Sequence, residues 1–207
     1  MNLSDHYIYL DSKRKMQRKG VTCVILAGGQ GKRMGTKNKA LIPFNNSTLI
    51  EHAIQALKPQ VDEIIISANR DLSYLKALGF TVIEDQTKNQ GPLIGIVSAA
   101  EHINTKTVVV TPCDVINIPD TYVKELIFTL ELTKSDVVVA KTKQRTQHLN
   151  CAFKLEAIEN LKTIISEGSL KVSDWQAQMK TSYVEFDRKG EQYFKNLNEP
   201  CDFSEAP

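Results

Sequence analysis

A glycine-rich loop with nearby cations follows the first apolar run of the sequence. Gly28, Gly29 and Gly31 are three glycines within four positions, and Arg33 and Lys39 come shortly after them. Glycines let backbone N–H groups approach a ligand closely and tolerate a positive φ angle. Fixed cations beside such a loop balance the charge of a triphosphate. The pattern therefore predicts a cradle for the phosphates of a nucleotide.

Two other phosphate-binding motifs fit this loop poorly. A Walker A loop needs a glycine five residues before its Gly-Lys pair and a serine or threonine after it. Here Leu26 and Arg33 occupy those places around Gly31-Lys32. A dinucleotide fingerprint wants an acidic residue at the end of the second strand, where this sequence has Asn69. The first motif fails, and the second is disfavoured.

Asp114 is the candidate metal ligand of the sequence. It follows an apolar run as the last residue of Thr111-Pro112-Cys113-Asp114. A carboxylate at the carboxyl end of a strand, in the same crevice as a phosphate loop, suits Mg²⁺. A Pro-x-Asp sequence also favours a simple turn, and for Asp114 alone the two interpretations are equal. Together with the glycine loop, the position favours the metal.

A second group of candidates lies between these two loops. Asp85 closes another apolar run and has the chemistry to accept hydrogen bonds from a base or ribose. Gly91 and Gly95 stand at the start of a helical stretch, where they allow another group to pack closely. Ordinary loop chemistry explains all three equally well, so both interpretations stay open. His148 is interpreted as a surface histidine, and spacing alone assembles no Ser-His-Asp or Cys-His set.

The elements that must position these residues follow from the apolar pattern after Gly20. Strands are expected at 21–26, 63–68, 81–83, 107–111 and 136–141, where near-continuous apolar runs suit burial on both faces. Helices are expected at 49–58, 72–78, 92–103 and 121–132, the last with Pro119 in its first turn. A strand near 149–154, two helices within 155–180 and a strand at 181–185 extend the same domain. This alternation predicts an α/β, three-layer, Rossmann-like fold with a mostly parallel sheet.

The loops after four strands are the expected site, because ligands of open α/β sheets bind beyond the carboxyl ends of the strands. These are the loops after Leu26, Ala68, Ile83 and Thr111. A single domain is expected over residues 20–207, since a chain of 207 residues is long enough to bury one full core.

Composition excludes several classes of protein. Hydrophobic residues make up 42% and charged residues 24%, as in ordinary globular domains. No apolar stretch approaches the roughly 18 residues that span a membrane, and the sequence begins without the apolar core of a secretion signal. Four cysteines without a C-x-x-C pair indicate reduced thiols. We therefore expect a cytoplasmic protein with no membrane partner.

The net charge of +2 is unevenly distributed. Residues 1–19 contribute +3, so the remainder carries −1 and has no nucleic-acid footprint. The basic residues of this leader are Lys13, Arg14, Lys15, Arg18 and Lys19. Such a leader can bind an acidic partner, but a disordered N-terminal extension is the favoured interpretation.

Taken in order, these motifs resemble the molybdenum cofactor guanylyltransferase family. The family sequence L-A-G-G-x-x-x-R-M-G-x-x-K matches residues 26–39, and the chain continues with Asn69, Asp85 and Gly91-Pro92-Leu93-x-Gly95. Pro112-Cys113-Asp114 follows, and residues 194–202 are similar to the closing phrase F-x-N-x-N-x-P-x-D. The opening motif alone is shared with other nucleotidyltransferases, whereas its combination with the closing phrase is specific.

The resemblance implies a GT-A-like domain that moves GMP from GTP to the terminal phosphate of molybdopterin, loaded with molybdenum, and releases pyrophosphate. It implies Mg²⁺ as cofactor and other proteins of molybdenum cofactor biosynthesis as candidate partners. In the implied nucleotide site, the main chain of Leu26, Ala27 and Gly28 holds the nucleotide, with Gly29 close by. Arg33 and Lys39 are implied at the phosphates, Asn69 and Asp85 at base or ribose, and Asp114 at the metal. Asn198 and Asp202 are implied to border the acceptor pocket.

Two departures and several alternatives accompany the resemblance. Asn38 stands where the family commonly has an aspartate, which removes a negative charge beside Lys39, and Leu149 replaces a proline often found after the histidine. A cytidylyltransferase acting on the same pterin would tend to carry L-A-A-G in place of Leu26-Ala27-Gly28-Gly29. A sugar-phosphate enzyme would often carry R-L-x-P-L-T. The chain could also be a dinucleotide-binding oxidoreductase or a catalytically silent nucleotide-binding module. Metal dependence discriminates, because the transferase needs Mg²⁺ to turn over whereas NAD binding does not.

Overall fold

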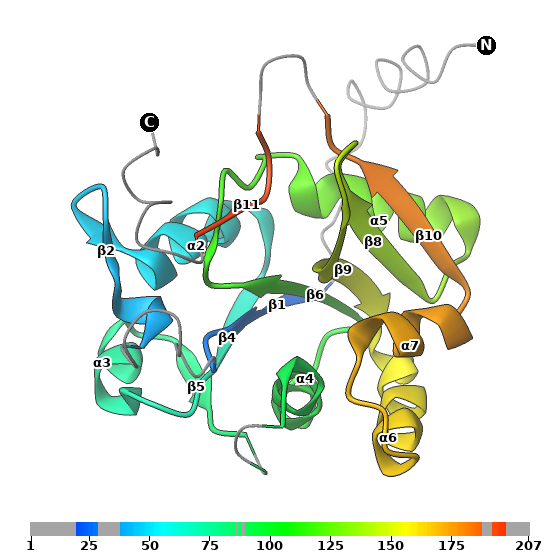
Figure 1. Ribbon diagram of the computed structural model, residues 1–207, viewed down its shortest axis with the longest axis horizontal. Helices are drawn as coiled ribbons and strands as arrows, with labels where there is room; N and C mark the ends of the chain where they lie inside the picture. The colour runs from blue at the N-terminus through cyan, green and yellow to red at the C-terminus, as the bar shows by residue number, and fades with distance from the viewer. Residues whose placement is uncertain (1–19, 29–37, 86, 88–89, 188–191, 198–207) are drawn as a thin grey trace.

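The structure is a computed structural model that describes residues 20–28, 38–85, 87, 90–187 and 192–197 (Figure 1). Its centre is a seven-stranded sheet in the order β10-β8-β9-β6-β1-β4-β5. The strands are β1 (Val21–Leu26), β4 (Glu63–Ser67), β5 (Thr81–Ile83), β6 (Thr107–Pro112), β8 (Val137–Lys141), β9 (Thr146–Lys154) and β10 (Thr181–Glu185). All neighbouring pairs are parallel except those of β9, which is antiparallel to both β6 and β8. The predicted mostly parallel sheet is confirmed.

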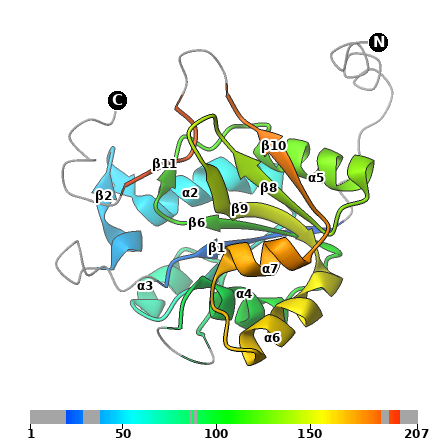
Figure 2. The same ribbon diagram turned by 45° about the vertical axis from the view of Figure 1, so that its right-hand side comes forward.

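Helices cover both faces of the sheet and complete the three layers (Figures 1 and 2). Helices α2 (Leu49–Leu57), α3 (Leu72–Ala77) and α5 (Tyr122–Thr133) pack on one face, and α4 (Pro92–Ala100), α6 (Ile158–Ser166) and α7 (Val172–Gln178) on the other. Strand β1 shows why both faces need a cover. Its Ile25 packs in the cluster with Ile50 of α2, whereas Val24 packs in the cluster with Leu93 of α4. Successive side chains of a strand point to opposite faces, so an unbroken apolar strand requires helices on each side.

The start of α5 differs from the prediction. The helix begins at Tyr122, and Pro119 lies before it rather than in its first turn. The carbonyl of Pro119 accepts hydrogen bonds from the Tyr122 N–H (3.0 Å) and from Nε2 of the buried Gln60 (3.1 Å). The Gln60 amide oxygen in turn accepts the N–H of Val123 at 3.1 Å. A glutamine from a distant turn therefore satisfies the N–H that a helix leaves unpaired at its beginning.

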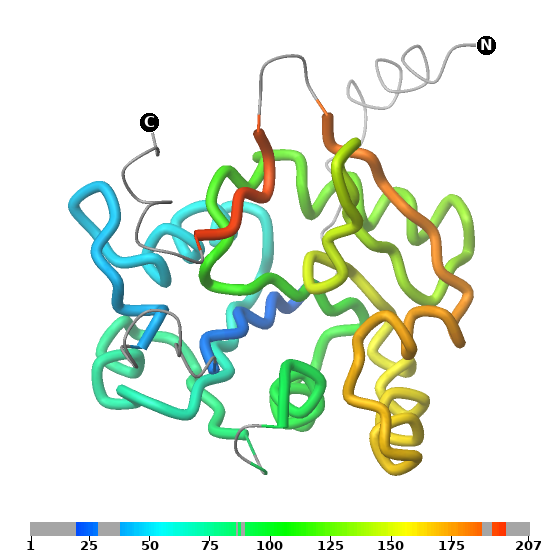
Figure 3. The backbone as a smooth tube through the Cα atoms, in the orientation of Figure 1, coloured from blue at the N-terminus to red at the C-terminus, as the bar shows by residue number. Residues whose placement is uncertain are grey.

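Two small antiparallel pairs were not predicted. Strands β2 (Pro43–Phe44) and β3 (Ser47–Thr48) form a hairpin whose turn residues Asn45 and Asn46 have φ angles of 43° and 67°. Strand β7 (Val115–Ile116) pairs with β11 (Lys195–Asn196). Figure 3 shows this late segment, in red, lying against the green segment that follows β6. The end of the described chain is therefore placed beside Asp114.

The remaining expectations concern membrane spans, the cysteines, His148 and the limits of the domain. No helix in the described ranges is long and apolar enough to cross a membrane. Cys23, Cys113 and Cys151 are buried free thiols. His148 is exposed, as interpreted from the sequence, and its ring Nδ1 lies 2.6 Å from Oε1 of Gln176. The leader at 1–19 lies outside the described residues, and a single domain over 20–207 stays a prediction.

Candidate active site

The carboxyl ends of three parallel strands meet at one edge of the sheet. Leu26 at the end of β1 is level with Ser67 of β4 and with Pro112 of β6. Two further backbone hydrogen bonds extend this alignment: Ala27 N–H donates to the Ser67 carbonyl at 2.8 Å, and Cys113 N–H donates to the Leu26 carbonyl at 3.0 Å. The loops predicted to form the site after β1, β4 and β6 therefore share an edge.

On the β4 side of this edge lies what we term the Asp85 cluster, comprising Gly28, Ser67, Asn69, Asp85 and Gly95. Ser67 Oγ donates to Asp85 Oδ1 at 3.0 Å, and Asn69 Nδ2 donates to Asp85 Oδ2 at 2.6 Å. The Asp85 N–H donates back to Asn69 Oδ1 at 3.1 Å. Asp85 is only 9% exposed, so these bonds fix its carboxylate while leaving lone pairs on each oxygen for a ligand.

The two glycines of the Asp85 cluster provide the space it needs. A Cβ added at Gly95 would collide with Ser67 Oγ and would also lie 3.2 Å from Asp85 Oδ1. A Cβ at Gly28 would lie 3.2 Å from Asn69 Nδ2 and 3.6 Å from Asp85 Oδ2. Of the two interpretations left open, close packing holds at Gly95, where the neighbours are Ser67 and Asp85, whereas at Gly91 the φ angle is 94° and no described atom lies within 4 Å of an added Cβ. The Gly28 backbone thus faces the amide and the carboxylate that the resemblance assigns to base or ribose.

On the β6 side, Lys39 and Asp114 form an ion pair through Lys39 Nζ and Asp114 Oδ2. Both side chains are largely buried, with 17% and 15% of their surface exposed. The second carboxylate oxygen, Asp114 Oδ1, is buried and has no hydrogen-bond partner in the described part of the chain. Buried carboxylate oxygens are rarely left without a partner. An unpaired carboxylate oxygen is the arrangement that a bound metal ion would complete, and the neighbouring Lys39 is the group that suits a phosphate.

Asp114 is held by the backbone around it. It lies in the turn between β6 and β7, so the turn interpretation is correct as far as it goes. Its carbonyl accepts the Leu197 N–H at 3.0 Å, a bond that accompanies the β7–β11 pairing. The neighbouring Cys113 side chain points into the core, where burial raises the pKa of its thiol well above the usual range. Cys113 therefore acts as a core spacer that leaves Asp114 at the edge.

Lys39 is the first residue of a short 3-10 helix, η2 (Lys39–Leu41). Asn38 caps this turn, because its Oδ1 accepts the Ala40 N–H at 3.1 Å. Asn38 Nδ2 donates to Asp71 Oδ2 at 2.8 Å. Asparagine in place of the family's aspartate at position 38 therefore does more than remove a charge, because its side-chain amide both donates and accepts a hydrogen bond.

Some of the remaining implied site residues lie within the described part of the chain and others lie outside it. Leu26, Ala27 and Gly28 are at the edge as expected, whereas Gly29, Arg33, Asn198 and Asp202 lie outside the described residues. Ser67 was missed, although a buried serine closing the run Ile64-Ile65-Ile66 carried a signal. Among the residues described, no three His, Cys, Asp or Glu side chains gather as a metal site. A divalent cation would rest on Asp114, with ligand oxygens and water supplying the rest, which is the way Mg²⁺ is usually held.

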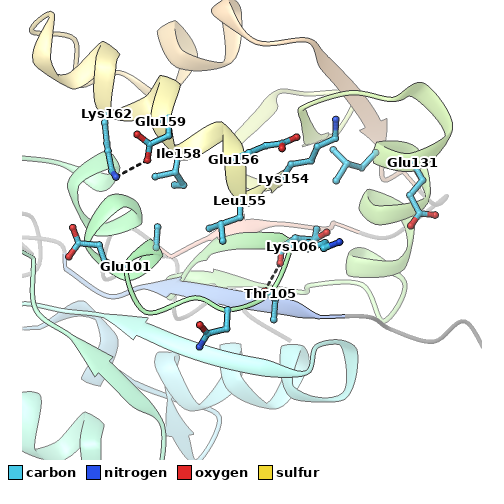
Figure 4. A pocket seen from close by; sticks show the side chains of 14 residues that line it. Glu101, Thr105, Lys106, Glu131, Lys154, Leu155, Glu156, Ile158, Glu159 and Lys162 are labelled. Atoms are coloured by element: carbon cyan, nitrogen blue, oxygen red, sulfur yellow. Dashed lines mark hydrogen bonds and ion pairs between the residues drawn. The ribbon is translucent and has the colours of Figure 1, made fainter.

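A sizeable cavity lies elsewhere. It has a volume of about 800 Å³ and is lined by residues before β6 and after β9, among them Thr105, Lys106 and Leu155 (Figure 4). Those positions mark the amino ends of the parallel strands, opposite the edge that carries Asp114. Since ligands of such sheets bind at the carboxyl ends, cavity size does not locate the active site here.

Gly28, just beyond the first parallel strand, and the ion-paired Asp114, just beyond a neighbouring strand, share the carboxyl edge of the sheet, as in the class of nucleotide-binding α/β domains. Comparison with known proteins narrows that class. Residues 23–181 match the MobA-like NTP transferase domain, and the chain belongs to this family. A molybdenum cofactor guanylyltransferase of Shewanella sp. (strain ANA-3) is 34% identical over 181 residues, which cover 87% of this chain and 91% of that protein.

Solved structures share the fold. The molybdopterin-guanine dinucleotide biosynthesis protein A of Archaeoglobus fulgidus has a TM-score of 0.71 at 20% identity, covering 88% of this chain and 95% of that one. Rv0371c of Mycobacterium tuberculosis, solved in complex with manganese, has a TM-score of 0.63 at 13% identity, covering 82% and 90%. These likenesses confirm the predicted Rossmann-like nucleotidyltransferase architecture.

Proposed function

We propose that this chain transfers GMP from GTP to the terminal phosphate of molybdopterin in its molybdenum-loaded form and releases pyrophosphate. One observation carries the proposal: Lys39 and Asp114 are paired at the edge where the glycine turn begins, and Asp114 Oδ1 has no partner among the residues that the structure describes. Family membership supports the nucleotidyl transfer, and the guanylyltransferase relative supports the base and the acceptor.

The reaction balances as an in-line displacement at phosphorus. An oxygen of the acceptor phosphate forms a bond to the α-phosphorus of GTP, and the bond from that phosphorus to the β-bridging oxygen breaks. Pyrophosphate departs with the electron pair. A phosphate monoester is already an anion near neutral pH, so the reaction needs no obligatory general base. The principal task of the protein is to bring two anions together and to neutralise their charge.

The two sides of the edge divide this task. The backbone from Leu26 to Gly28 would hold the nucleotide, with the Asp85 cluster beside it to select base or ribose. Lys39 would move from its partner Asp114 to the phosphates, and Arg33 would hold the departing β- and γ-phosphates. Asn198 and Asp202 would border the acceptor.

Asp114 is the residue proposed to hold a divalent cation, Mg²⁺. Its unpartnered, buried Oδ1 fits that role, because hard cations prefer carboxylate oxygen and keep several waters or phosphate oxygens as further ligands. A cation held by Asp114 would supply positive charge that neutralises the phosphates. Rv0371c, a protein of the same fold, was solved in complex with manganese, which supports the proposal of a divalent cation.

The setting of the reaction is also a proposal. The buried thiols Cys23, Cys113 and Cys151 are free, as suits a reducing cytoplasm. Other proteins of molybdenum cofactor biosynthesis would deliver the pterin or receive the product.

The deciding experiment is a calorimetric titration of the full chain with GTP, CTP, ATP, UTP and NAD, each with and without Mg²⁺. We expect selective binding of GTP that strengthens with Mg²⁺ and loses this gain in Asp114→Ala. A preference for CTP would keep the mechanism and change the product. Binding of NAD alone, indifferent to the metal, would overturn the proposed function.

A further inference from the structure

We infer that Asn38 is a positioning residue that fixes Lys39 through a hydrogen bond to Asp71. The inference rests on the proposed function, because it assigns Lys39 to the phosphates. The bond joins two loops far apart in sequence: Asn38 closes the glycine loop, and Asp71 lies between β4 and α3. In this bond, Asn38 Nδ2 donates to Asp71 Oδ2 over a distance of 2.8 Å.

On the Asn38 side, the amide controls where Lys39 begins. Asn38 has an extended conformation, with φ −63° and ψ 116°, and caps η2 by accepting the Ala40 N–H. The single turn is closed by hydrogen bonds from Leu41 N–H to the Asn38 carbonyl (3.1 Å) and from Ile42 N–H to the Lys39 carbonyl (3.2 Å). The backbone of Lys39 is therefore held on both sides, and rotation of the Asn38 side chain would release the cap.

On the Asp71 side, the carboxylate faces Asn38 rather than its own helix. Asp71 occupies the capping position of α3 with a φ of 52°. Its side chain makes no capping bond to α3, although aspartate is among the preferred capping residues. Asp71 Oδ2 accepts the Asn38 amide instead. The side chain is thus committed to the glycine loop.

The chemistry of this pair demands an amide at position 38. An ionised Asp71 can only accept, so its partner must donate, whereas the Ala40 N–H needs an acceptor. Asparagine supplies both groups. An aspartate at 38 would keep the acceptor for Ala40 and place a second negative charge against Asp71.

The consequence is that the Asp85 cluster and the Lys39–Asp114 pair, the two sides of the active edge at the carboxyl ends of the strands, are held in place relative to each other. The β4–α3 loop that carries Asp71 also carries Asn69 of the Asp85 cluster. The Asn38–Asp71 bond therefore ties the backbone that presents Lys39 to the backbone that presents Asn69. Lys39 is thereby positioned relative to the nucleotide as well as to Asp114.

The test exchanges the two partners in the full chain. Asn38→Asp should lower kcat/KM for GTP about tenfold, chiefly through kcat, because two carboxylates would face each other. Asn38→Asp combined with Asp71→Asn restores a donor and an acceptor in reversed places and should return within about threefold of the unaltered protein. Asn104→Asp makes the same chemical change at an exposed position on the opposite edge of the sheet and serves as the matched control. A reversed pair as impaired as Asn38→Asp would overturn the inference.

A second comparison separates positioning from general structural support. If Asn38 acts through Lys39, Asn38→Asp should add less than about twofold to the loss caused by Lys39→Ala. A full tenfold addition would mean that Asn38 supports something else and would contradict the inference. GTP binding separates a failure of the proposed function from a failure of this inference. An unaltered protein that fails to bind GTP contradicts the proposed function, whereas a protein sensitive to Lys39→Ala and insensitive to Asn38→Asp contradicts this inference alone.

Discussion

The two sides of the active edge are built on opposite principles. In the Asp85 cluster, the carboxylate accepts hydrogen bonds from Ser67 and Asn69, and a glycine at 95 leaves the room they need. In the Lys39–Asp114 pair, one carboxylate oxygen has a single cationic partner and the other has none in the described part of the chain. The first arrangement is complete without a ligand, and the second is completed by one.

From this difference we expect the Asp85 cluster to select the nucleotide and the Lys39–Asp114 pair to take part in the phosphate chemistry. A pre-bonded carboxylate presents fixed lone pairs and so distinguishes ligands by hydrogen-bond geometry. On the proposed function, the partly satisfied ion pair would exchange partners when a polyphosphate and a cation bind, and it would stabilise charge where bonds change. Damage to the first should therefore appear in affinity and selectivity, and damage to the second in turnover.

The largest effect should come from Asp114. We expect Asp114→Asn to lower turnover at least about 10²-fold, because it removes the charge that would hold the cation while preserving side-chain shape. Initial rates of pyrophosphate release at saturating GTP measure it. Asp136→Asn, which removes the ion-paired partner of Lys154 at the opposite edge, is the control and should be nearly unaffected. Near-normal turnover in Asp114→Asn would contradict the metal assignment.

A smaller effect, on binding, is expected at Gly95. Gly95→Ala should weaken GTP binding about tenfold and leave the dependence on Mg²⁺ unchanged, because its methyl group displaces Ser67 and Asp85. Calorimetry at several Mg²⁺ concentrations separates the two effects. Adding Ser67→Ala removes the atom in closest conflict and should recover part of the affinity. A loss of Mg²⁺ dependence in Gly95→Ala would contradict the separate roles given to the Asp85 cluster and the Lys39–Asp114 pair.

Cys113 tests whether a neighbour of Asp114 belongs to the chemistry. Burial, and then the charge of Asp114, raise the pKa of this thiol, so at pH 8 it stays protonated and should not react with a thiol reagent in the native protein. Cys113→Ala should cost about 1 kcal/mol of folding stability and change turnover less than about twofold. Labelling would be followed in a Cys201→Ser background. Rapid native labelling of Cys113 would place it at the site.

The smallest effect is predicted away from both sides, at the start of α2. Glu51 accepts hydrogen bonds from the Thr48 hydroxyl (2.6 Å) and the Thr48 N–H (2.7 Å), and these bonds lower the pKa of its carboxyl. A lowered folded-state pKa gives stability that is present above the ordinary value of 4.5 and lost as the pH falls through the lowered value.

Urea unfolding of Glu51→Gln should accordingly show a deficit of about 0.5 kcal/mol at pH 7 that fades near pH 3. GTP binding should not change. A deficit of equal size at both pH values would show that the charge of Glu51 is not the cause.

Much of the fold could be predicted because its main strands are buried on both faces. The strands expected at 21–26, 81–83 and 181–185 match β1, β5 and β10 to the residue, although of these three only β1 is buried along its length. The direction of β9 could not be predicted, since an apolar run looks the same whether its neighbours are parallel or antiparallel. The β7–β11 pair joins segments of two residues each, and so short a strand has no periodicity to read.

The candidate site was predictable where a residue's type matters and less so where its partners matter. Gly28, Lys39 and Asp114 stand out because a phosphate site needs glycine, cation and carboxylate. Ser67 was missed because its role depends on the register of β4 against β5, which brings it to Asp85. Asn38 was treated as an absent charge because its partner Asp71 lies 33 positions away. Hydrogen bonds between distant loops leave no local pattern in a sequence.

The reversed direction of β9 also affects how the family can diversify. Because β9 is antiparallel, the turn between β8 and β9 opens at the same edge as the nucleotide loops. There Arg145 donates to Asn196 Oδ1 at 2.9 Å, next to the segment that leads to Asn198 and Asp202. Insertions into that turn would remodel the approach to the acceptor without disturbing a single parallel strand. On the proposed function, this one antiparallel strand would thus let the acceptor side change without altering the nucleotide side.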